Sequence, residues 1–527
     1  MLLTSTSGGD IRADGMVTAF TLTGGSAGAA RFGNAGNPVQ NLGAFTAAGG
    51  FSLTGGGTVN VNDAVQAGTG TTLALVADHL TVSGGSLSFA GASAANLITL
   101  SADTVGLGGS TVDASSLGVI AIAPRTPGTA MSLGTDLAAT TAALLRLGSL
   151  DAMSITAGSL TIGHSFDAAN VPNLALYATG AVSQTGGALT NVASVAGTGS
   201  AFTLPQALND IATLGPVTAT VGDVAVTSQT GLTVAGNVAG ANVRIQAGGF
   251  GLTLGRGDVP GNLAAGFGGA VSLTADALAQ AAPGGSISAA SGTVEFAPYT
   301  LNHDMRLGGI GGNVALPGSL TASVLRLGEA NGHVTAGNIS FEAATTVAAG
   351  QLDLQANSDI SQVSGAKLTA GTLSGAARSL SLNDPGNAIG LLSSFTTTAG
   401  LALNDGQTLA VSGAVQAGPA TPVPGGPILA LTTAGTLTLA GSLTGGTVSL
   451  ATSAGDVPAS GGTIIADTLT GSVSGTATLT GAANAVAKLG GFTAGGDISF
   501  VDNQALEVTG VAGPARRRPP APAPCSP

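Results

Sequence analysis

The acidic side chains are the first candidates for chemistry, because enzymes that cleave polysaccharides use paired carboxylates as acid and base. The chain has 26 Asp and Glu residues, and they are scattered along it. Many stand beside asparagine, in Asn62-Asp63, Asn209-Asp210, Asn383-Asp384, Asn404-Asp405 and Asp502-Asn503. Side chains in such pairs commonly bond their own backbone in Asx turns. With aromatic residues at only 3% to stack on sugars, the sequence predicts no catalytic residue and no enzyme activity.

The histidines show no metal-binding pattern. They are His79, His164, His303 and His333. Zinc needs three or four converging ligands, and none of these residues has a second histidine or a cysteine nearby in the sequence. Only His303-Asp304 forms a polar pair, and we interpret it as a local feature without a metal-binding or catalytic role. The calcium-binding nonapeptide repeat, the phosphate loop and the dinucleotide fingerprint are also missing, so we predict no metal and no cofactor.

One tripeptide has the residues of an adhesive motif. Arg256-Gly257-Asp258 is the sequence read by integrins, and it lies in the segment GLTLGRGDVPGN. It follows an alternating strand pattern and precedes a proline, which places it on an exposed turn. A tripeptide is a short signal in a chain with 86 glycines. We therefore predict Arg256, Gly257 and Asp258 as a candidate adhesive turn.

The composition restricts the class of protein. Hydrophobic residues make up 44% and charged residues 8% of the 527 residues, whereas disordered chains combine low hydrophobicity with high net charge. Collagen is excluded because glycine has no three-residue period. The formal net charge of −12 argues against a nucleic-acid partner. A single cysteine, Cys525, cannot support a disulfide framework within the chain.

The mean hydropathy is positive, at +0.46, yet no membrane span is predicted. Polar residues or glycine interrupt each apolar run well before the ~18 residues that a membrane helix needs. The first residues, MLLTSTSGGDIRADG, have no basic residue before Arg12 and no sustained apolar core. They do not resemble a signal peptide.

The chain repeats itself over long distances. The segment 387–418 matches 37–68 without a gap, with Phe395 at the place of Phe45. A shortened copy starts near Asn484 and a more diverged one near Asn209. The Pro-containing segment 123–134 returns at 297–308, which gives a long period of about 175 residues. Such self-similarity predicts a solenoid.

Short alternating pairs predict the strands of this solenoid. Val59-x-Val61 and Leu80-x-Val82 each alternate apolar and polar residues, as half-buried strands do. Val59 and Leu80 occupy similar contexts 21 residues apart. We predict an all-β parallel β-helix with three short strands in each turn of about 20 residues.

The predicted organisation has three parts. Residues 1–31 form a frayed or truncated start, 32–512 a continuous solenoid, and 513–527 a disordered Pro/Ala/Arg-rich tail. The Pro-rich segment 419–427 is predicted to be a loop at a corner, since proline cannot donate to a sheet ladder. The repeated asparagines at 37, 209, 387 and 484 are interpreted as turn residues, because an asparagine ladder needs them in adjacent turns.

Segments such as 428–450, ILALTTAGTLTLAGSLTGGTVSL, and 41–53, NLGAFTAAGGFSL, resemble the repeat regions of filamentous haemagglutinin-like exoproteins. The resemblance covers residues 32–511 and is one of repeat style. It implies a right-handed parallel β-helix in a large bacterial adhesin, exported by two-partner secretion or as an autotransporter passenger. The implied location is extracellular or at the cell surface. The implied partners are host cells, matrix or glycans, and an outer-membrane transporter during export.

The family's secretion motif of the Asn-Pro-Asn-Gly type is not supplied by the segment 37–40, and the sequence shows no C-terminal barrel. We therefore expect a fragment of a longer exoprotein. Two other functions remain open. One is a carbohydrate-active β-helix enzyme, which clustered carboxylates on one face would favour. The other is a self-assembling surface-layer or biofilm-matrix protein.

Overall fold

The strands of the computed structural model stack in parallel as a β-solenoid of about 23 turns, with about 21 residues per turn. The structure describes all residues except 108–109, 134–139, 148–156, 164, 309–311, 343–345, 460, 511 and 515–527. In the described part of the chain, the regular secondary structure consists of β-strands alone. This confirms the predicted all-β fold and the predicted length of a turn.

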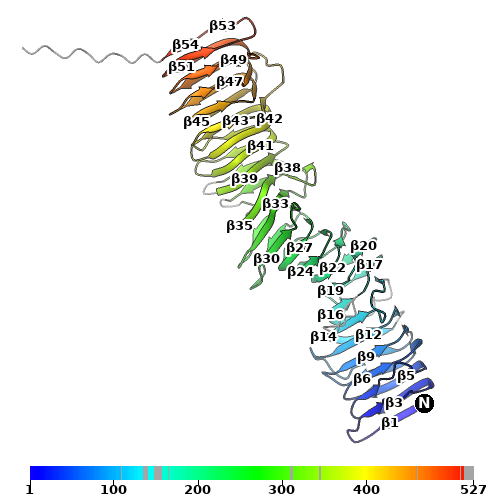
Figure 1. Ribbon diagram of the computed structural model, residues 1–527. Coiled ribbons are helices and arrows are strands. Elements are labelled where there is room, and N and C mark those ends of the chain that lie inside the picture. The colour runs from blue at the N-terminus through cyan, green and yellow to red at the C-terminus, as the bar shows by residue number, and fades with distance from the viewer. Residues whose placement is uncertain are drawn as a thin grey trace, which may run out of the picture. The chain divides into compact units, whose positions relative to one another are not determined.

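The described residues form two compact units, and Figure 1 labels many of their strands. Unit 1 consists of Met1–Val271, Ala279–Ala289 and Pro317–Leu320. Unit 2 consists of Ser272–Leu278, Ala290–Leu316 and Thr321–Pro527. In both units the neighbouring turns pair through parallel strands.

The strands that lie wholly in unit 1 are β1 (Leu2–Ser5), β2 (Ile11–Ala13), β3 (Ala19–Ser26), β4 (Ala30–Phe32), β5 (Val39–Ala47), β6 (Phe51–Thr54), β7 (Thr58–Val61), β8 (Ala64–Ala67), β9 (Thr72–Val76), β10 (His79–Val82), β11 (Ser86–Phe89), β12 (Leu97–Ser101), β13 (Thr104–Gly106), β14 (Thr111–Ala123), β15 (Met131–Leu133), β16 (Thr140–Leu147), β17 (Leu160–Ile162), β18 (Phe166–Asp167), β19 (Asn173–Tyr177), β20 (Val182–Gln184), β21 (Leu189–Thr190), β22 (Ser194–Gly199), β23 (Phe202–Leu204), β24 (Thr213–Ala219), β25 (Val224–Ser228), β26 (Leu232–Val234), β27 (Gly236–Gly240), β28 (Val243–Ala247), β29 (Leu252–Leu254) and β30 (Gly261–Ala265). Four strands contribute residues to both units: β31 (Ala270–Thr274), β32 (Leu278–Gln280), β33 (Gly285–Ala297) and β35 (Ser319–Leu327).

The strands that lie wholly in unit 2 are β34 (His303–Leu307), β36 (Glu329–Ala330), β37 (His333–Val334), β38 (Ala336–Phe341), β39 (Thr346–Gln355), β40 (Asp359–Gln362), β41 (Lys367–Leu382), β42 (Ala388–Asp405), β43 (Leu409–Val411), β44 (Ala414–Ala417), β45 (Ile428–Thr433), β46 (Leu437–Leu439), β47 (Ser442–Thr452), β48 (Val457–Pro458), β49 (Thr463–Val473), β50 (Ala477–Leu479), β51 (Ala485–Ala494), β52 (Ile498–Phe500), β53 (Glu507–Val508) and β54 (Ala512–Pro514).

One turn of unit 1 illustrates the register. Strands β7, β8 and β9 follow one another around the turn, and they pair with β10, β11 and β12 of the next turn. Val59 lies opposite Leu80, the pair that the sequence placed in equivalent contexts. Three strands per turn, as predicted, therefore give a three-sided cross-section in which each side is one layer of a parallel sheet.

The apolar residues of the alternating pairs point inward. Val59 and Val61 are 1% and 0% exposed, while the residues between and before them face outward. Burial of each such side chain contributes roughly 1.5–3 kcal/mol. The largest side chains in this core are phenylalanines, and the rings of Phe32, Phe45 and Phe51 contact one another with centroids 4.9–6.0 Å apart. The alternating pattern is thus the origin of the core.

Each repeat starts with an asparagine that is the last residue of a tight turn, as predicted. The side chains of these asparagines, however, lie inside the solenoid. Asn37 is fully buried, and its Oδ1 accepts a hydrogen bond from the amide of Val17 at 2.7 Å. Its Nδ2 donates to the carbonyl of Thr54 at 2.9 Å. Val17 and Thr54 belong to the preceding and the following turn, so a single amide joins three turns. A polar side chain is stable there because its hydrogen bonds are made.

The same contacts recur at other asparagines. In each, Oδ1 accepts from an amide of the preceding turn and Nδ2 donates to the carbonyl five residues earlier. These residues are Asn37, Asn96, Asn209, Asn387 and Asn484. Asn96 was not predicted. Asn209 and Asn387 also exchange two side-chain hydrogen bonds with Gln184 and Gln362, respectively.

In both Pro-containing segments, a threonine donates two hydrogen bonds to an aspartate of the preceding turn. The amide and hydroxyl of Thr126 both donate to Asp103 at 2.7 Å. In the second copy the amide and hydroxyl of Thr300 donate to Asp276 at 2.7 and 2.6 Å. The backbone hydrogen bond from Thr126, reinforced by its hydroxyl, lowers the pKa of Asp103. The sequence repeat at 123–134 and 297–308 therefore preserves a structural hydrogen-bond pair.

The structure describes both ends of the predicted solenoid. Residues 1–31, expected to be a frayed or truncated start, contain strands in register with the next turn, such as β1 with β3. Near the other end, β54 pairs with β51, so Gly513 and Pro514 belong to a strand and not to the tail. The rest of the predicted tail, 515–527, lies outside the described residues.

Candidate functional site

The Arg256-Gly257-Asp258 tripeptide forms the tip of a short hairpin in unit 1. It lies between β29 and β30, and the backbones of Arg256 and Val259 bond each other in both directions, at 2.9 and 3.1 Å. Gly257 has a φ of +60°, as the first central residue of a type II′ turn requires. Glycine adopts this φ without steric cost. Gly257 therefore allows the tight turn on which Arg256 and Asp258 are placed.

The hairpin is an addition to the corner of the solenoid. Six residues, 255–260, separate β29 from β30. The corresponding corner after β10 has three residues, 83–85, and the one after β46 has two, 440–441. Those shorter corners connect equivalent strands, so the fold does not need the additional residues. They are available for recognition.

The two charged groups of this hairpin differ in their contacts. Asp258 is exposed, and its carboxylate has no hydrogen bond or ion pair with any residue that the structure describes. The Arg256 guanidinium instead donates from Nη1 to Thr213 Oγ1 at 3.1 Å. Thr213 pairs with Thr233, and Thr233 with Thr253, on successive turns. The arginine therefore lies back along a row of threonines, while the carboxylate projects freely.

Two phenylalanines stand on the other corners of the same turn of the chain. Phe250 is 84% exposed in the turn before β29, and Phe267 is 97% exposed in the turn after β30. Each sits among glycines, in Gly248–Gly251 and Gly266–Gly269, and a backbone hydrogen bond closes each turn. Fully exposed aromatic rings are uncommon. The signal that could have predicted them is a phenylalanine with a glycine directly on each side.

A cluster of charges in unit 2 was not predicted from the sequence. Arg326 contacts Glu295 at 2.9 Å, Asp353 at 2.9 Å and Glu329 at 3.7 Å. The three acids are mostly buried, with side chains 10%, 11% and 19% exposed. Clustered carboxylates are the feature that would favour a carbohydrate-active enzyme, so their surroundings are decisive.

The cluster has the character of a structural ion pair network. Glu295 Oε2 accepts hydrogen bonds from Ser272 Oγ at 2.7 Å and from the amide of Asn331 at 2.9 Å. Asp353 Oδ1 accepts one from Gln355 Nε2 at 2.8 Å. Although burial opposes its charge, the hydrogen bond to Asp353 and the nearby carboxylates raise the pKa of Arg326. The guanidinium thus stays charged, and both oxygens of Glu295 and of Asp353 are already engaged.

The histidines remain apart. His79 Nδ1 lies 2.7 Å from Thr104 Oγ1, and His303 Nε2 lies 3.2 Å from Asn313 Nδ2. His333 is exposed at the end of a hairpin, and His164 lies outside the described residues. Among the residues that the structure describes, no three His, Cys, Asp or Glu side chains converge as metal ligands would.

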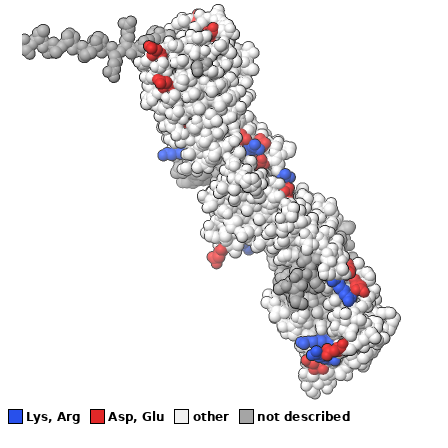
Figure 2. Space-filling view, in the orientation of Figure 1, with Lys and Arg blue, Asp and Glu red and all other residues white. Residues whose placement is uncertain are grey.

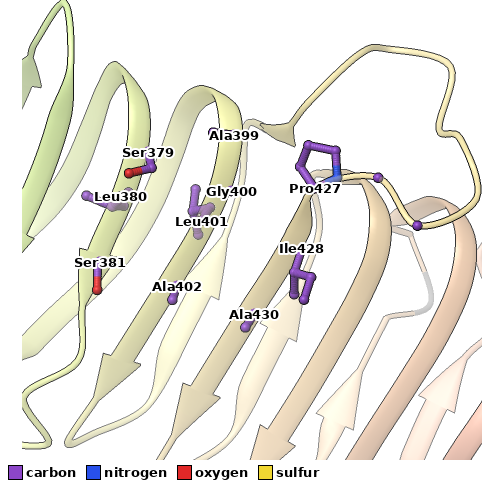
Figure 3. Close-up of a pocket in the computed structure, with 12 residues that line it drawn as sticks. Ser379, Leu380, Ser381, Ala399, Gly400, Leu401, Ala402, Pro427, Ile428 and Ala430 are labelled. Atoms are coloured by element: carbon purple, nitrogen blue, oxygen red, sulfur yellow. The ribbon is translucent and has the colours of Figure 1, made fainter.

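The Pro-rich loop 419–427 forms one wall of a groove in unit 2. Leu409 pairs with Leu437, so the additional residues of this turn leave the stack at the corner, as predicted. The groove has a volume of about 690 Å³. Figure 3 shows Ser381, Ala402 and Ala430 on its floor, on neighbouring strands, with Pro427 at its side. Its lining is uncharged: Ser379, Leu380, Ser381, Ala399, Gly400, Leu401, Ala402, Gly425, Gly426, Pro427, Ile428 and Ala430.

The visible surface in Figure 2 is mostly uncharged, with small separate groups of acidic and basic side chains. Among the described residues, no helix is long and apolar enough to cross a bilayer. Comparison of the chain with protein-family models, with curated proteins and with solved structures found no match. The candidate site therefore rests on its own geometry.

Proposed function

We propose that this chain is an adhesin-like, non-enzymatic binding protein that acts outside the cell, at the bacterial surface or after secretion. Its partner is a receptor on a host cell or a matrix protein, with glycans as a further class of ligand. The observation that carries the proposal is the closed, exposed hairpin at Arg256-Gly257-Asp258, which enlarges a corner that other turns complete with two or three residues.

The proposal is physically reasonable because the molecule combines a rigid stack of strands with an exposed turn. Parallel strands hydrogen-bonded on both sides form a rigid support, and recognition residues commonly lie on loops that such a support positions. The turn is held by two backbone hydrogen bonds, so little conformational entropy is lost when a receptor binds it. The free carboxylate of Asp258 is then available to the partner, beside an arginine that is held by Thr213.

In the proposed function, the protein reaches the surface through an outer-membrane transporter. The resemblance to filamentous haemagglutinin-like repeats supports this route, which two-partner secretion or an autotransporter would provide. The proposal includes no nucleic-acid partner, because the net charge is −12.

Attachment of cells and matrix proteins to the immobilised chain tests the proposal. We expect saturable attachment to the wild type and loss of attachment to Asp258→Asn, which removes one charge without changing the size of the side chain. Asp63→Asn is the matched control, since Asp63 is also an exposed turn aspartate. Equal attachment to all three proteins, or no attachment to the wild type, would overturn the proposed role of the turn.

Two assays separate the alternative functions. Release of sugars from a polysaccharide panel by the wild type but not by Glu295→Gln would favour the carbohydrate-active enzyme. Concentration-dependent assembly of the purified chain, followed by light scattering, would favour a surface-layer or biofilm-matrix protein. We expect neither sugar release nor assembly.

A further inference from the structure

A two-residue hairpin covers the charge cluster around Arg326. Strands β36 and β37 pair antiparallel, with Asn331 and Gly332 as the two residues of the turn. Their φ angles are +53° and +79°. Positive φ at both positions defines a type I′ turn, for which Asn-Gly is the preferred sequence.

This is the only Asn-Gly step in the 527 residues. Asn331 and Gly332 are both exposed. Neither the side-chain amide of Asn331 nor the backbone amide of Gly332 has a hydrogen-bond partner among the residues that the structure describes. A Cβ added to Gly332 would meet nothing within 4 Å, so the turn is open to solvent.

We propose that Asn331 is a site of spontaneous deamidation, and that the modification releases the hairpin from the cluster around Arg326. The proposal is independent of the adhesive function.

The chemistry uses only the chain and water. A base removes the proton of the Gly332 amide, and the resulting nitrogen attacks the side-chain carbon of Asn331. The new carbon–nitrogen bond closes a succinimide ring, and the side-chain nitrogen leaves as ammonia after taking up a proton. Water then opens one of the two imide carbon–nitrogen bonds and gives aspartate or isoaspartate. One water is consumed, one ammonia is released, and no atom is oxidised or reduced.

The residue after the asparagine controls this reaction, because its side chain obstructs the attacking nitrogen. Glycine offers no obstruction. Two other asparagines share the positive φ, Asn191 and Asn302, but Val192 and His303 follow them. Their amides are also engaged, with Asp167 and Asn357. They serve as internal controls within the same molecule.

The consequence follows from the contacts below the hairpin. The amide of Asn331 donates to Glu295 at 2.9 Å, and Glu329 on the same hairpin lies 3.7 Å from Arg326. A new carboxylate at position 331 stands beside acids that already share one guanidinium, and like charges at short range repel. Isoaspartate also inserts a methylene into the backbone of a two-residue turn, which the I′ geometry does not accommodate. Both changes oppose the closed hairpin.

The test is to incubate the purified protein in mildly alkaline buffer and follow its peptides by mass spectrometry. We expect the mass gain of amide hydrolysis, and isoaspartate labelling by an isoaspartyl methyltransferase, in the Asn331 peptide before the Asn191 or Asn302 peptides. Amide hydrogen exchange in Glu329–Val334 should become faster in the modified fraction.

Two variants make the result specific. Asn331→Gly keeps residues that suit a I′ turn but cannot deamidate, so it should show neither the mass gain nor the change in exchange with time. Asn331→Asp should exchange faster from the start. The proposal is overturned if Asn331 is modified no faster than Asn302. It is also overturned if the modified and fresh hairpins exchange at the same rate.

Discussion

The ring of Phe492 lies against the backbone of Gly471, its register partner on the neighbouring strand. A Cβ at Gly471 would stand 2.5 Å from Phe492 Cε2 and 2.7 Å from the carbonyl of Leu450. Two other repeats preserve this relationship, with Gly24 opposite Phe45 and Gly375 opposite Phe395. A glycine in one turn thus provides the space for a phenylalanine in the next.

Gly471→Ala should therefore destabilise the protein, because the added methyl group overpacks the core at a cost of roughly 1–3 kcal/mol. The measurement is chemical or thermal unfolding of the variant beside the wild type. Gly491→Ala is the control in the same pair of turns, since nothing lies within 4 Å of its added Cβ. A Gly471→Ala protein as stable as Gly491→Ala would show that the packing at Phe492 is loose.

Asn387→Ala should lower the free energy of unfolding by more than the small loss of side-chain volume would. The change leaves the amide of Leu368, the carbonyl of Asn404 and the side chain of Gln362 without their bonds to Asn387. A buried polar group that loses its partner costs about 1–3 kcal/mol. Asn383→Ala, at an exposed position nearby, should change the unfolding free energy little. Equal stability of the two variants would contradict the three-turn bridge.

Asp405 should make stability fall as the pH rises. It is 1% exposed, and its Oδ2 has no hydrogen-bond partner among the residues that the structure describes. Burial raises the pKa of Asp405 from 3.8 to about 6, against the hydrogen bond from the amide of Ile389. The folded state therefore holds a proton that the unfolded state has lost, and the stabilisation is complete below pH 3.8 and disappears as the pH rises through about 6.

Asp405→Asn removes this proton binding and serves as the reference. The unfolding free energy of the wild type, taken relative to the variant, should decrease between pH 4 and pH 7, the interval that brackets the raised pKa. A constant difference, or one that increases with pH, would show that folding does not raise the pKa of Asp405.

Arg326→Met should destabilise unit 2, since it leaves Glu295, Glu329 and Asp353 without their common cation. Breaking a fully buried pair costs several kcal/mol, but the Arg326 side chain is 29% exposed. We therefore expect a loss of about 1–3 kcal/mol in the free energy of unfolding, reduced by high salt. Arg12→Met removes an exposed pair with Asp14 and should have no measurable effect. Similar stability of the two variants would contradict the structural role of the cluster.

The sequence was sufficient to predict the stack of parallel strands. Val59 and Leu80 showed the length of a turn, and the prolines at 419–427 indicated the loop that leaves it. These features are local, because each depends on alternation or on turn chemistry within a few residues. The exposed turn at Arg256-Gly257-Asp258 was predicted for the same reason.

Features that depend on register were not predictable in the same way. Glu295, Arg326 and Asp353 are separated by turns of 31 and 27 residues, both longer than the average turn, and only the three-dimensional stack places them together. The repeated asparagines were interpreted as simple turn residues, because they lie too far apart in the sequence to form a ladder between adjacent turns. Nothing in the sequence around Asn37 indicates that its side chain points inward.

Removal of the hairpin at 255–260 provides the most direct test of its proposed adhesive role, because two or three residues complete the corresponding corners of other turns. The change replaces residues 255–260 by the two residues, Ala-Gly, that complete the corresponding corner at 440–441. Attachment of cells to the wild type and to the shortened protein is then measured, with circular dichroism and thermal unfolding as the check that the solenoid is intact. We predict an unchanged spectrum and melting temperature with loss of attachment. Full attachment by the folded, shortened protein would contradict the account.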